Sequence, residues 1–331
     1  MLAKKDGGVY NYVYRKGDDI VEVVYIVCAV VGGVIALVLF AAWICFRLAF
    51  LAVRRAKSNA EEYSIPDGEI YEPFRETMVA WMKEVRAMPY EAMSVVSFDG
   101  LTLRGKYYEY APGAPIELMF HGYRGSAERD LCGGVQRCFA LKRNVLLVDQ
   151  RSCGDSDGRV ITFGIHERRD CLAWIECIRR RFGDDAKIIL TGISMGAATV
   201  LMAAAEPLPE MVIGVLADCG YTSARDIIQK VIKQMKLPAG LLYPFVKCGA
   251  KLYGGFDLEE TSPLQAMRTC RVPVLFIHGE NDDFVPCEMS VRNYETCTTR
   301  KQLFTVPGAG HGLSYLLQPQ MYLAVLKDFF G

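Results

Sequence analysis

The chain has 331 residues, of which 51% are hydrophobic and 23% are charged. Lys and Arg together number 38, as do Asp and Glu, so the formal net charge is zero. This balance, without a basic stripe, argues against a nucleic-acid partner. The sequence also lacks repeats, low-complexity tracts and clusters with metal-ligand spacing. We therefore expect neither a metal nor a cofactor.

A long apolar segment lies near the N-terminus, behind a polar tail formed by residues 1–22. Residues 23–46 contain no charged side chain and are numerous enough to cross a bilayer as a helix. A cleaved signal peptide is the alternative, but this apolar run is too long and lacks a convincing small-x-small cleavage site. The pattern predicts a retained single-pass membrane anchor.

The side of the membrane that carries the rest of the chain is harder to predict. Four Lys or Arg residues precede the apolar segment and four closely follow it, so the positive-inside rule does not decide. Ten of the twelve cysteines lie beyond the segment, without a C-x-x-C pair. Unpaired thiols are typical of a reducing setting, either a cytoplasmic face or the surface of an anaerobe. We favour the cytoplasmic face.

Residues 47–90 read as a polar linker that contains one amphipathic helix. Its apolar side chains follow the i, i+4, i+7, i+8, i+11 pattern of one helix face. We expect this helix either to dock on the domain that follows or to lie in the membrane interface. The apolar residues of the pattern are Phe74, Met78, Trp81, Met82 and Val85.

From residue 91 onward, strand-like and helical stretches alternate. Residues 94–98 and 101–108 alternate around Asp99-Gly100, which predicts a two-residue hairpin. The later runs are mostly apolar along their whole length, as in a parallel sheet that is buried on both faces. We therefore predict an α/β fold with a mostly parallel eight-stranded sheet and helices on both faces. The later runs are 116–120, 145–148, 188–190, 212–216, 274–277 and 303–306.

Ser194 is the most informative residue, because it lies in Gly192-Ile193-Ser194-Met195-Gly196 between an apolar strand and a small-residue helix. This order is typical of a nucleophile elbow, in which a strained turn exposes a serine hydroxyl above a sheet. A second G-x-S-x-G pattern surrounds Ser156, but no helix follows it directly. Two flanking aspartates there oppose formation of an alkoxide. We therefore select Ser194 as the nucleophile.

A nucleophilic serine needs a base and a carboxylate that orients the base. His311 lies on a glycine-rich loop after the last predicted strand, and Asp282 lies on the loop after the strand before it. We interpret these two residues as base and acid. Asp283 is an alternative acid by a one-residue slip, and Asp218, at the end of an earlier strand, is another.

The oxyanion hole is expected from backbone N–H groups. One donor is the N–H of Met195, at the start of a helix whose dipole favours negative charge. The other is predicted to be the N–H of Tyr123, in the turn His121-Gly122-Tyr123-Arg124 after a strand. Arg124 either lines the substrate pocket or is a solvated loop residue.

The longest stretch outside the alternation is 224–270. In folds of this kind such an insertion usually forms a cap over the serine. This one is helical and then apolar and aromatic. We expect Leu242, Tyr243 and Phe245 to line the substrate pocket, the alternative being a helix packed on the sheet.

With these motifs in view, residues 91–331 resemble the α/β-hydrolase superfamily. More narrowly, they resemble bacterial, often membrane-anchored, hydrolases grouped with serine esterases and dipeptidyl-aminopeptidase-like enzymes. The chain order Ser194, Asp282, His311 is the order of that fold. One departure is Ser152-Cys153, where an Arg-Gly dipeptide is common. The matching segments are HGYRGSAERD (121–130), VDQRSCGDSDGR (148–159), GISMGAAT (192–199), ADCGYTS (217–223), HGENDDFVP (278–286) and GAGHG (308–312).

The resemblance implies a membrane-anchored serine hydrolase that cleaves a carboxylic ester, with a small-molecule or lipid-like acyl substrate and no cofactor. An aminopeptidase or an acyltransferase would use the same three residues with a different pocket. A catalytically idle, membrane-tethered binding protein is the remaining alternative.

Overall fold

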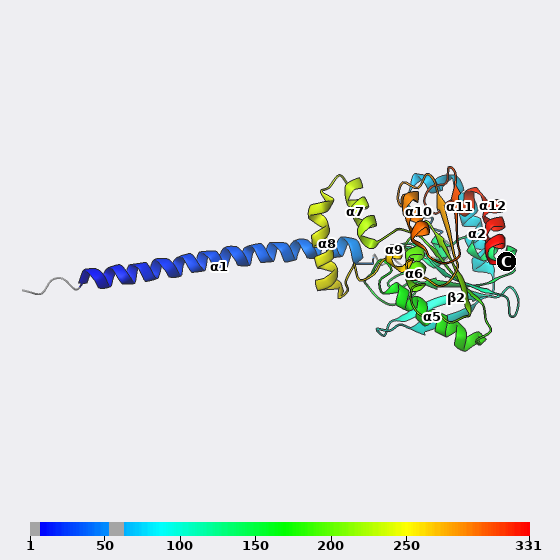
Figure 1. The fold of residues 1–331 in the computed structure, drawn as a ribbon, viewed down its shortest axis with the longest axis horizontal. Helices are drawn as coiled ribbons and strands as arrows, with labels where there is room; N and C mark the ends of the chain where they lie inside the picture. Colours follow the sequence, from blue (N-terminus) through cyan, green and yellow to red (C-terminus); the bar gives the residue numbers. More distant parts are fainter. Residues whose placement is uncertain (1–6, 53–62) are drawn as a thin grey trace, which may run out of the picture.

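The N-terminal helix α1 (Gly7–Phe50) extends from the rest of the protein as a long rod (Figure 1). The computed structural model describes residues 7–52 and 63–331, with side chains from residue 21 onward. Part of the predicted polar tail, residues 1–6, therefore lies outside the described residues. From Gly7 the backbone is helical, so the helix extends beyond the predicted span 23–46 at both ends. Within it, Val21–Phe50 is long and apolar enough to cross a membrane.

The predicted linker contains two consecutive helices, η1 (Glu69–Phe74) and α2 (Arg75–Ala87). Residues 53–62 of this linker lie outside the described part of the chain. Met78 and Met82 of α2 are buried, and Trp81 stacks on Tyr315 with ring centroids 5.6 Å apart. The amphipathic helix thus docks on the α/β domain (residues 91–331), which was the first of the two predicted alternatives.

The α/β domain is built on one eight-stranded sheet with the order β1-β2-β4-β3-β5-β6-β7-β8. β1 and β2 pair antiparallel, as do β2 and β4, and all remaining neighbours are parallel. The predicted mostly parallel sheet is therefore confirmed. The strands are β1 (Glu91–Val96), β2 (Thr102–Tyr108), β3 (Ile116–Phe120), β4 (Asn144–Asp149), β5 (Ile188–Ile193), β6 (Val212–Asp218), β7 (Val274–Gly279) and β8 (Lys301–Val306).

The connection between β1 and β2 differs from the predicted two-residue hairpin. β1 ends at Val96 and β2 begins at Thr102, so five residues connect them. Ser97 explains the earlier end, because its hydroxyl donates to Asp99 at 2.6 Å and accepts from the Leu101 N–H at 2.8 Å. A side chain that bonds to the following backbone favours a turn over continued strand pairing.

Successive residues of a strand point to opposite sides of the sheet, so a strand that is apolar along its length has two faces to bury. Helices cover both faces. Leu190 packs into the larger core with α5 and α6, whereas its neighbour Ile189 packs into a second core with α12. The helices that follow β3 are α3 (Ala127–Asp130), α4 (Gly134–Ala140), α5 (Glu167–Phe182), α6 (Met195–Ala203), α7 (Ala224–Gln234), α8 (Ala239–Gly254), α9 (Pro263–Ala266), α10 (Cys287–Thr296), α11 (Ser314–Leu317) and α12 (Pro319–Phe330).

The segment 224–270, predicted as a cap, forms helices α7, α8 and α9, and α8 crosses the C-terminal part of α1 (Figure 1). Gly249 permits this close crossing, because a Cβ there would lie 2.5 Å from the Ala42 carbonyl oxygen. The Tyr253 hydroxyl donates to the Leu39 carbonyl at 3.0 Å. The insertion is therefore packed against the apolar N-terminal helix.

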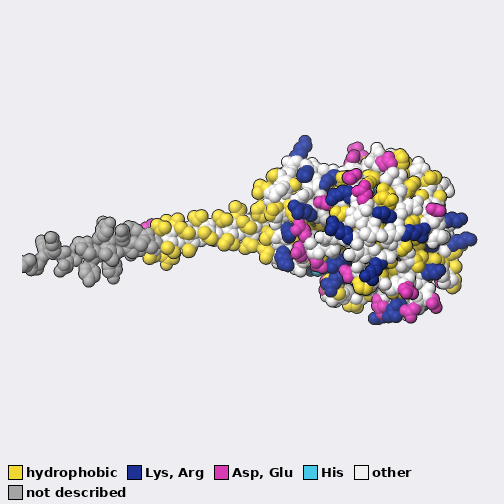
Figure 2. Space-filling model, in the orientation of Figure 1, with side chains coloured by type: hydrophobic (Ala, Val, Ile, Leu, Met, Phe, Trp, Pro, Cys, Tyr) yellow, Lys and Arg dark blue, Asp and Glu magenta, His cyan; other side chains and the backbone are white. Residues whose placement is uncertain are grey.

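The surface of the protein changes along its length. Figure 2 shows a nearly uncharged apolar rod where α1 leaves the α/β domain. On the face of the α/β domain shown there, basic and acidic side chains are intermingled. This distribution agrees with the zero net charge.

Candidate active site

Ser194 lies in a sharp turn between β5 and α6, with φ 55° and ψ −116°. Such a conformation is strained for any residue with a side chain and persists only where the surroundings impose it. Gly192 and Gly196 make the turn possible. A Cβ on Gly192 would lie 2.2 Å from the Gly196 carbonyl carbon, and one on Gly196 would lie 2.0 Å from the Phe120 carbonyl oxygen. Both glycines are therefore required by close backbone approach.

His311 and Asp282 lie next to Ser194, although more than 80 residues of sequence separate it from either of them. The hydroxyl oxygen of Ser194 is 2.9 Å from His311 Nε2. His311 Nδ1 is 2.7 Å from Asp282 Oδ2. One imidazole thus connects the serine to the carboxylate, which is the geometry in which a histidine can accept the serine proton.

Asp282 is buried and held as an anion. Its Oδ1 accepts the N–H groups of Phe284 and Val285 at 2.9 and 2.7 Å. Burial by itself would raise the pKa of this carboxyl, but hydrogen bonds from His278 and His311 outweigh burial and hold the pKa well below its usual range. Asp282 therefore stays charged at any pH at which a neutral imidazole could accept a proton.

Neither of the two alternative acids is bonded to the His311 ring. Asp283 is exposed, and its backbone carbonyl accepts a hydrogen bond from Gln234 at 3.0 Å. Asp218 is buried and accepts the Tyr322 hydroxyl at 2.9 Å. Neither carboxylate is within hydrogen-bond distance of the His311 ring, whose Nδ1 is occupied by Asp282.

His278 is a functional candidate that the sequence analysis did not select. It is fully buried at the end of β7, and its Nε2 lies 3.2 Å from Asp282 Oδ2 and 2.8 Å from the Val285 carbonyl oxygen. A carbonyl only accepts, so Nε2 carries the proton in this arrangement. In the sequence, His278 precedes Gly279 at the end of a strand, and backbone geometry explains this pair better than catalysis.

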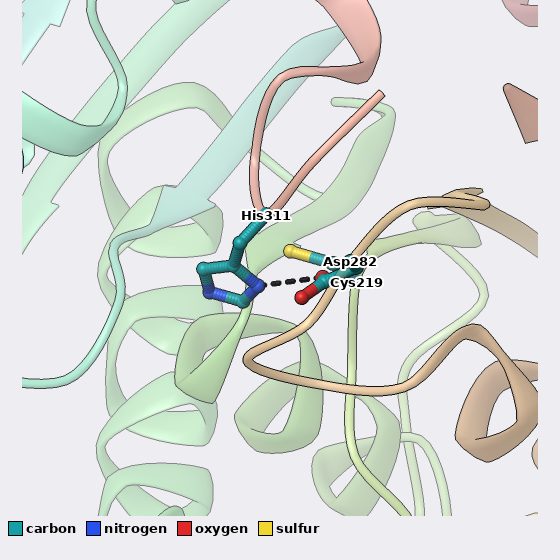
Figure 3. Close-up of side chains that lie close together, drawn as sticks. All are labelled: Cys219, Asp282 and His311. Carbon is teal, nitrogen blue, oxygen red and sulfur yellow. Dashed lines mark hydrogen bonds and ion pairs between the residues drawn. The ribbon is translucent and has the colours of Figure 1, made fainter. Parts of the chain in front are cut away.

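Cys219, Asp282 and His311 are a group of described residues whose ligand atoms lie within 4.8 Å of one another (Figure 3). Figure 3 shows the His311 ring directed at the Asp282 carboxylate, with the Cys219 sulfur beside them. Burial raises the pKa of the Cys219 thiol well above its usual value, which disfavours the thiolate that metals bind. The hydrogen bond between the other two residues would also have to break to bind an ion.

The turn that follows β3 also lies next to Ser194. A Cβ on Gly122 would lie 3.6 Å from the Ser194 Cβ, so this backbone runs close to the serine. The Gly122 N–H donates to Asp130 Oδ2 at 3.0 Å and is therefore occupied. The next N–H along this turn is that of Tyr123, the residue predicted to supply the second oxyanion donor. The first predicted donor, Met195, is the first residue of α6.

A cavity of about 730 Å³ opens beside these groups. Ser194 and His311 line it, together with Tyr123 and Arg124. Leu242, Tyr243 and Phe245, predicted as pocket residues, do not line this cavity, because α8 lies against α1. Instead, one wall is formed by the linker around η1, including Pro66, Asp67, Gly68, Ile70 and Tyr71.

Tyr71 of that wall reaches the candidate base directly. Its hydroxyl donates to the His311 backbone carbonyl at 3.0 Å. The sequence carried no signal for this contact, since the acceptor is a backbone atom and the donor lies 240 residues away. The linker therefore contributes to the site as well as to its packing.

Arg124 borders the cavity, but its guanidinium points to the N-terminal helix. Its Nη2 donates to the carbonyl oxygens of Leu48 and Leu51 at 2.7 and 2.9 Å. Arg124 therefore lines the cavity, the first of the two predicted alternatives, but its Nη2 is bonded to backbone carbonyls. Backbone carbonyls of this kind leave no pattern in the sequence.

Ser156, of the second G-x-S-x-G pattern, has a structural role. Its hydroxyl donates to the Asp149 carbonyl at 2.6 Å and accepts the Arg104 N–H at 2.9 Å. A hydroxyl bonded in this way ties the loop to β2 and β4. It is absent from the cavity that contains Ser194.

Comparison with known proteins agrees with this fold and site. The family described as alpha/beta hydrolase fold matches residues 118–247, and the family described as serine hydrolase (FSH1) matches residues 230–313. Together with the eight-stranded sheet, these matches identify the chain as a member of the α/β-hydrolase superfamily.

Particular relatives extend the comparison. An uncharacterized protein of Bacillus subtilis is 29% identical over 187 residues, 56% of this chain and 61% of that protein, less than two thirds of its length. An uncharacterized membrane protein of Saccharomyces cerevisiae is 23% identical over 247 residues, 74% of this chain and 80% of that protein. An esterase structure from Pyrococcus furiosus shares the fold with a TM-score of 0.63 and 21% identity, over 85% of this chain and 99% of that one.

Proposed function

We propose that this protein is a membrane-anchored serine hydrolase that cleaves carboxylic esters, with Ser194 as nucleophile, His311 as base and Asp282 as the acid that orients the base. The observation that carries the proposal is the continuous hydrogen-bonded series from Ser194 Oγ through the His311 ring to Asp282 at the edge of the cavity. The serine-hydrolase family match and the likeness to an esterase fold support the same class.

In the proposed reaction, Ser194 Oγ attacks the ester carbonyl while His311 Nε2 accepts its proton. The N–H groups of Met195 and Tyr123 stabilise the negative charge that develops on the carbonyl oxygen. His311 then protonates the departing alkoxide, which leaves an acyl group on Ser194. A water molecule, activated by the same imidazole, releases the acid and restores the serine. Asp282 keeps Nδ1 protonated and the ring oriented throughout.

The test is labelling of the full chain in detergent with a fluorophosphonate, which reacts with activated serines. We expect the parent and Ser156→Ala to label and Ser194→Ala not to label. Labelling of Ser194→Ala, or none in a folded parent, would overturn the assignment. A panel of ester, aminoacyl-peptide and acyl-transfer substrates then identifies the reaction. Faster cleavage of peptides than of esters would replace the esterase assignment by an aminopeptidase. Faster acyl transfer to an alcohol than hydrolysis of the ester would replace it by an acyltransferase.

We also propose that α1 anchors the protein by a single pass. The exposed part of this helix, Val21–Phe40, has 20 residues, about 30 Å of helix at 1.5 Å per residue, which matches a hydrocarbon core of about 30 Å. Quenching of Trp43 fluorescence by brominated lipids, and retention in membranes after alkaline carbonate washing, are the expected results. Release by carbonate would contradict the proposal.

For the α/β domain we propose the cytoplasmic face. All twelve cysteines are free, as expected of a protein kept in a reducing compartment. The test is protease protection of a C-terminal tag in sealed cells and in inverted vesicles. Digestion of the tag in sealed cells would place the domain on the opposite side.

A further inference from the structure

The last turns of α1 are part of the α/β domain's packing. Ala42, Phe46 and Phe50 are buried, and the Phe50 ring meets Phe163 and Phe256 edge-on at centroid distances of 5.7 and 5.3 Å. An apolar helix that only tethered the domain would not need three buried side chains in its last three turns. The C-terminal end of α1 is therefore docked at a fixed place.

The backbone beyond α1 fixes this docking further. The Ile161 N–H donates to the Phe50 carbonyl at 2.8 Å, and the Ala52 N–H donates to the Arg159 carbonyl at 2.9 Å. Leu51 pairs with Val160 as an isolated antiparallel bridge. These contacts hold the helix end in register with the loop 159–161, so it can neither slide nor rotate freely.

The residues that bind this helix end are those of the candidate oxyanion turn. The Tyr123 hydroxyl donates to the Ala49 carbonyl at 2.7 Å, and Arg124 Nη2 donates to the Leu48 and Leu51 carbonyls at 2.7 and 2.9 Å. The last carbonyls of a helix have no partner within the helix, and a cation there is favoured by the helix dipole. Two consecutive side chains thus satisfy the end of α1.

The same two residues determine where the Tyr123 N–H lies. On one side of the turn, Asp130 Oδ2 accepts the Gly122 N–H at 3.0 Å. On the other side, Arg124 has a left-handed backbone with φ 53°, and its side chain and that of Tyr123 both end on α1. The peptide that carries the Tyr123 N–H is therefore held between Asp130 and the helix end.

We propose that residues 48–51, at the C-terminal end of α1 and just beyond it, position the oxyanion turn, with Tyr123 and Arg124 as the positioning residues that connect the membrane helix to the site. The inference rests on the proposed chemistry at Ser194. An oxyanion donor acts in the transition state and contributes little to substrate binding. A displaced turn therefore lowers kcat and leaves KM nearly unchanged.

The experiment compares two matched variants of the full chain in detergent, with a p-nitrophenyl ester as substrate. Tyr123→Phe removes the hydroxyl that binds α1 beside the site and keeps the ring, which packs on Phe163. Tyr253→Phe removes a tyrosine hydroxyl that binds a different α1 carbonyl, that of Leu39, through α8. We expect Tyr123→Phe to lower kcat by about tenfold at constant KM, and Tyr253→Phe to match the parent.

A second measurement separates positioning from general loss of structure. Binding of a trifluoromethyl ketone, which forms an oxyanion on Ser194, should weaken in Tyr123→Phe by the same factor as kcat. Binding of the carboxylate product should not change. Equal kcat values for Tyr123→Phe and the parent, or equal losses in both tyrosine variants, would overturn the inference.

Arg124 provides an independent pair of variants if Tyr123→Phe fails to fold. Arg124→Lys keeps a cation at the helix end, whereas Arg124→Gln removes the charge. We expect kcat to fall in the order parent, Arg124→Lys, Arg124→Gln, and identical values for the two variants would contradict positioning by this contact. If the parent itself neither hydrolyses esters nor reacts with the fluorophosphonate, then the proposed function fails. If the parent hydrolyses the ester and the variants have the same kcat as the parent, then only the positioning role is refuted.

Discussion

His278 Nε2 lies 3.2 Å from Asp282 Oδ2, the same carboxylate oxygen that His311 contacts, and both partners of this pair are fully buried. Asp282 is thus stabilised by two imidazoles, only one of which reaches Ser194. A hydrogen bond to a buried charge contributes about 1.5–3 kcal/mol. His278 therefore helps to hold the Asp282 carboxylate in the orientation that contacts His311.

Replacing His278 by glutamine is expected to lower kcat by about tenfold, because part of that stabilisation is lost while Asp282 keeps its two backbone N–H donors. The measurement is steady-state ester hydrolysis, with the melting temperature as a check on folding. An unchanged kcat in a folded variant would show that Asp282 does not depend on its second histidine.

Asp282→Asn should have a much larger effect. An amide in place of the carboxylate favours the wrong imidazole tautomer, and the loss of kcat is then on the order of 10⁴. The neighbouring change Asp283→Asn is the matched control, since Asp283 is exposed and lies one residue away. Activity within twofold of the parent is expected for the control. A large loss in Asp283→Asn together with a small one in Asp282→Asn would exchange their assignments.

Much of the fold could be predicted, because buried parallel strands are apolar on both faces. The run 116–120 corresponds to β3 and the run 145–148 to β4. Ser194, Asp282 and His311 were predictable for a related reason. Each follows a strand at the same edge of the sheet, so the order of motifs along the chain already brings them together.

The rest depended on contacts that leave no side-chain pattern. The segment 224–270 reads as a cap, but it packs on α1, from which it is separated by more than 170 residues of sequence. The Tyr71 and Arg124 side chains bind backbone carbonyls of distant segments. Any residue can offer a carbonyl, so such partners cannot be recognised from residue types.

The glycines of the elbow give a test of the backbone argument. Gly196→Ala would place a Cβ 2.0 Å from the Phe120 carbonyl oxygen. Both residues contribute backbone atoms to this contact, so the clash can be relieved only if β3 or α6 moves. We expect loss of fluorophosphonate labelling and a lower melting temperature. Gly240→Ala, in α8 with open space around the added methyl group, is the control and should behave as the parent. Normal labelling of Gly196→Ala would contradict the close packing of the elbow.

Asp218 offers a test that depends on pH. Burial raises its pKa from the usual 3.8 to about 6, although the hydrogen bond from the Tyr322 hydroxyl lowers the pKa in part. The folded state therefore binds this proton more tightly than the unfolded state. The resulting stabilisation is complete below a pH of about 4 and is lost as the pH rises through about 6.

Asp218→Asn removes this titration and keeps an oxygen that can accept the Tyr322 hydroxyl. Relative to the parent, the free energy of unfolding of the variant should rise by up to about 3 kcal/mol between low and neutral pH, from a pKa difference of about two units. Thermal unfolding of both proteins in detergent, at pH values below and above this window, measures the difference. A difference independent of pH would mean that Asp218 titrates alike in the folded and unfolded chains, and that the buried pair with Tyr322 carries a charge at no cost.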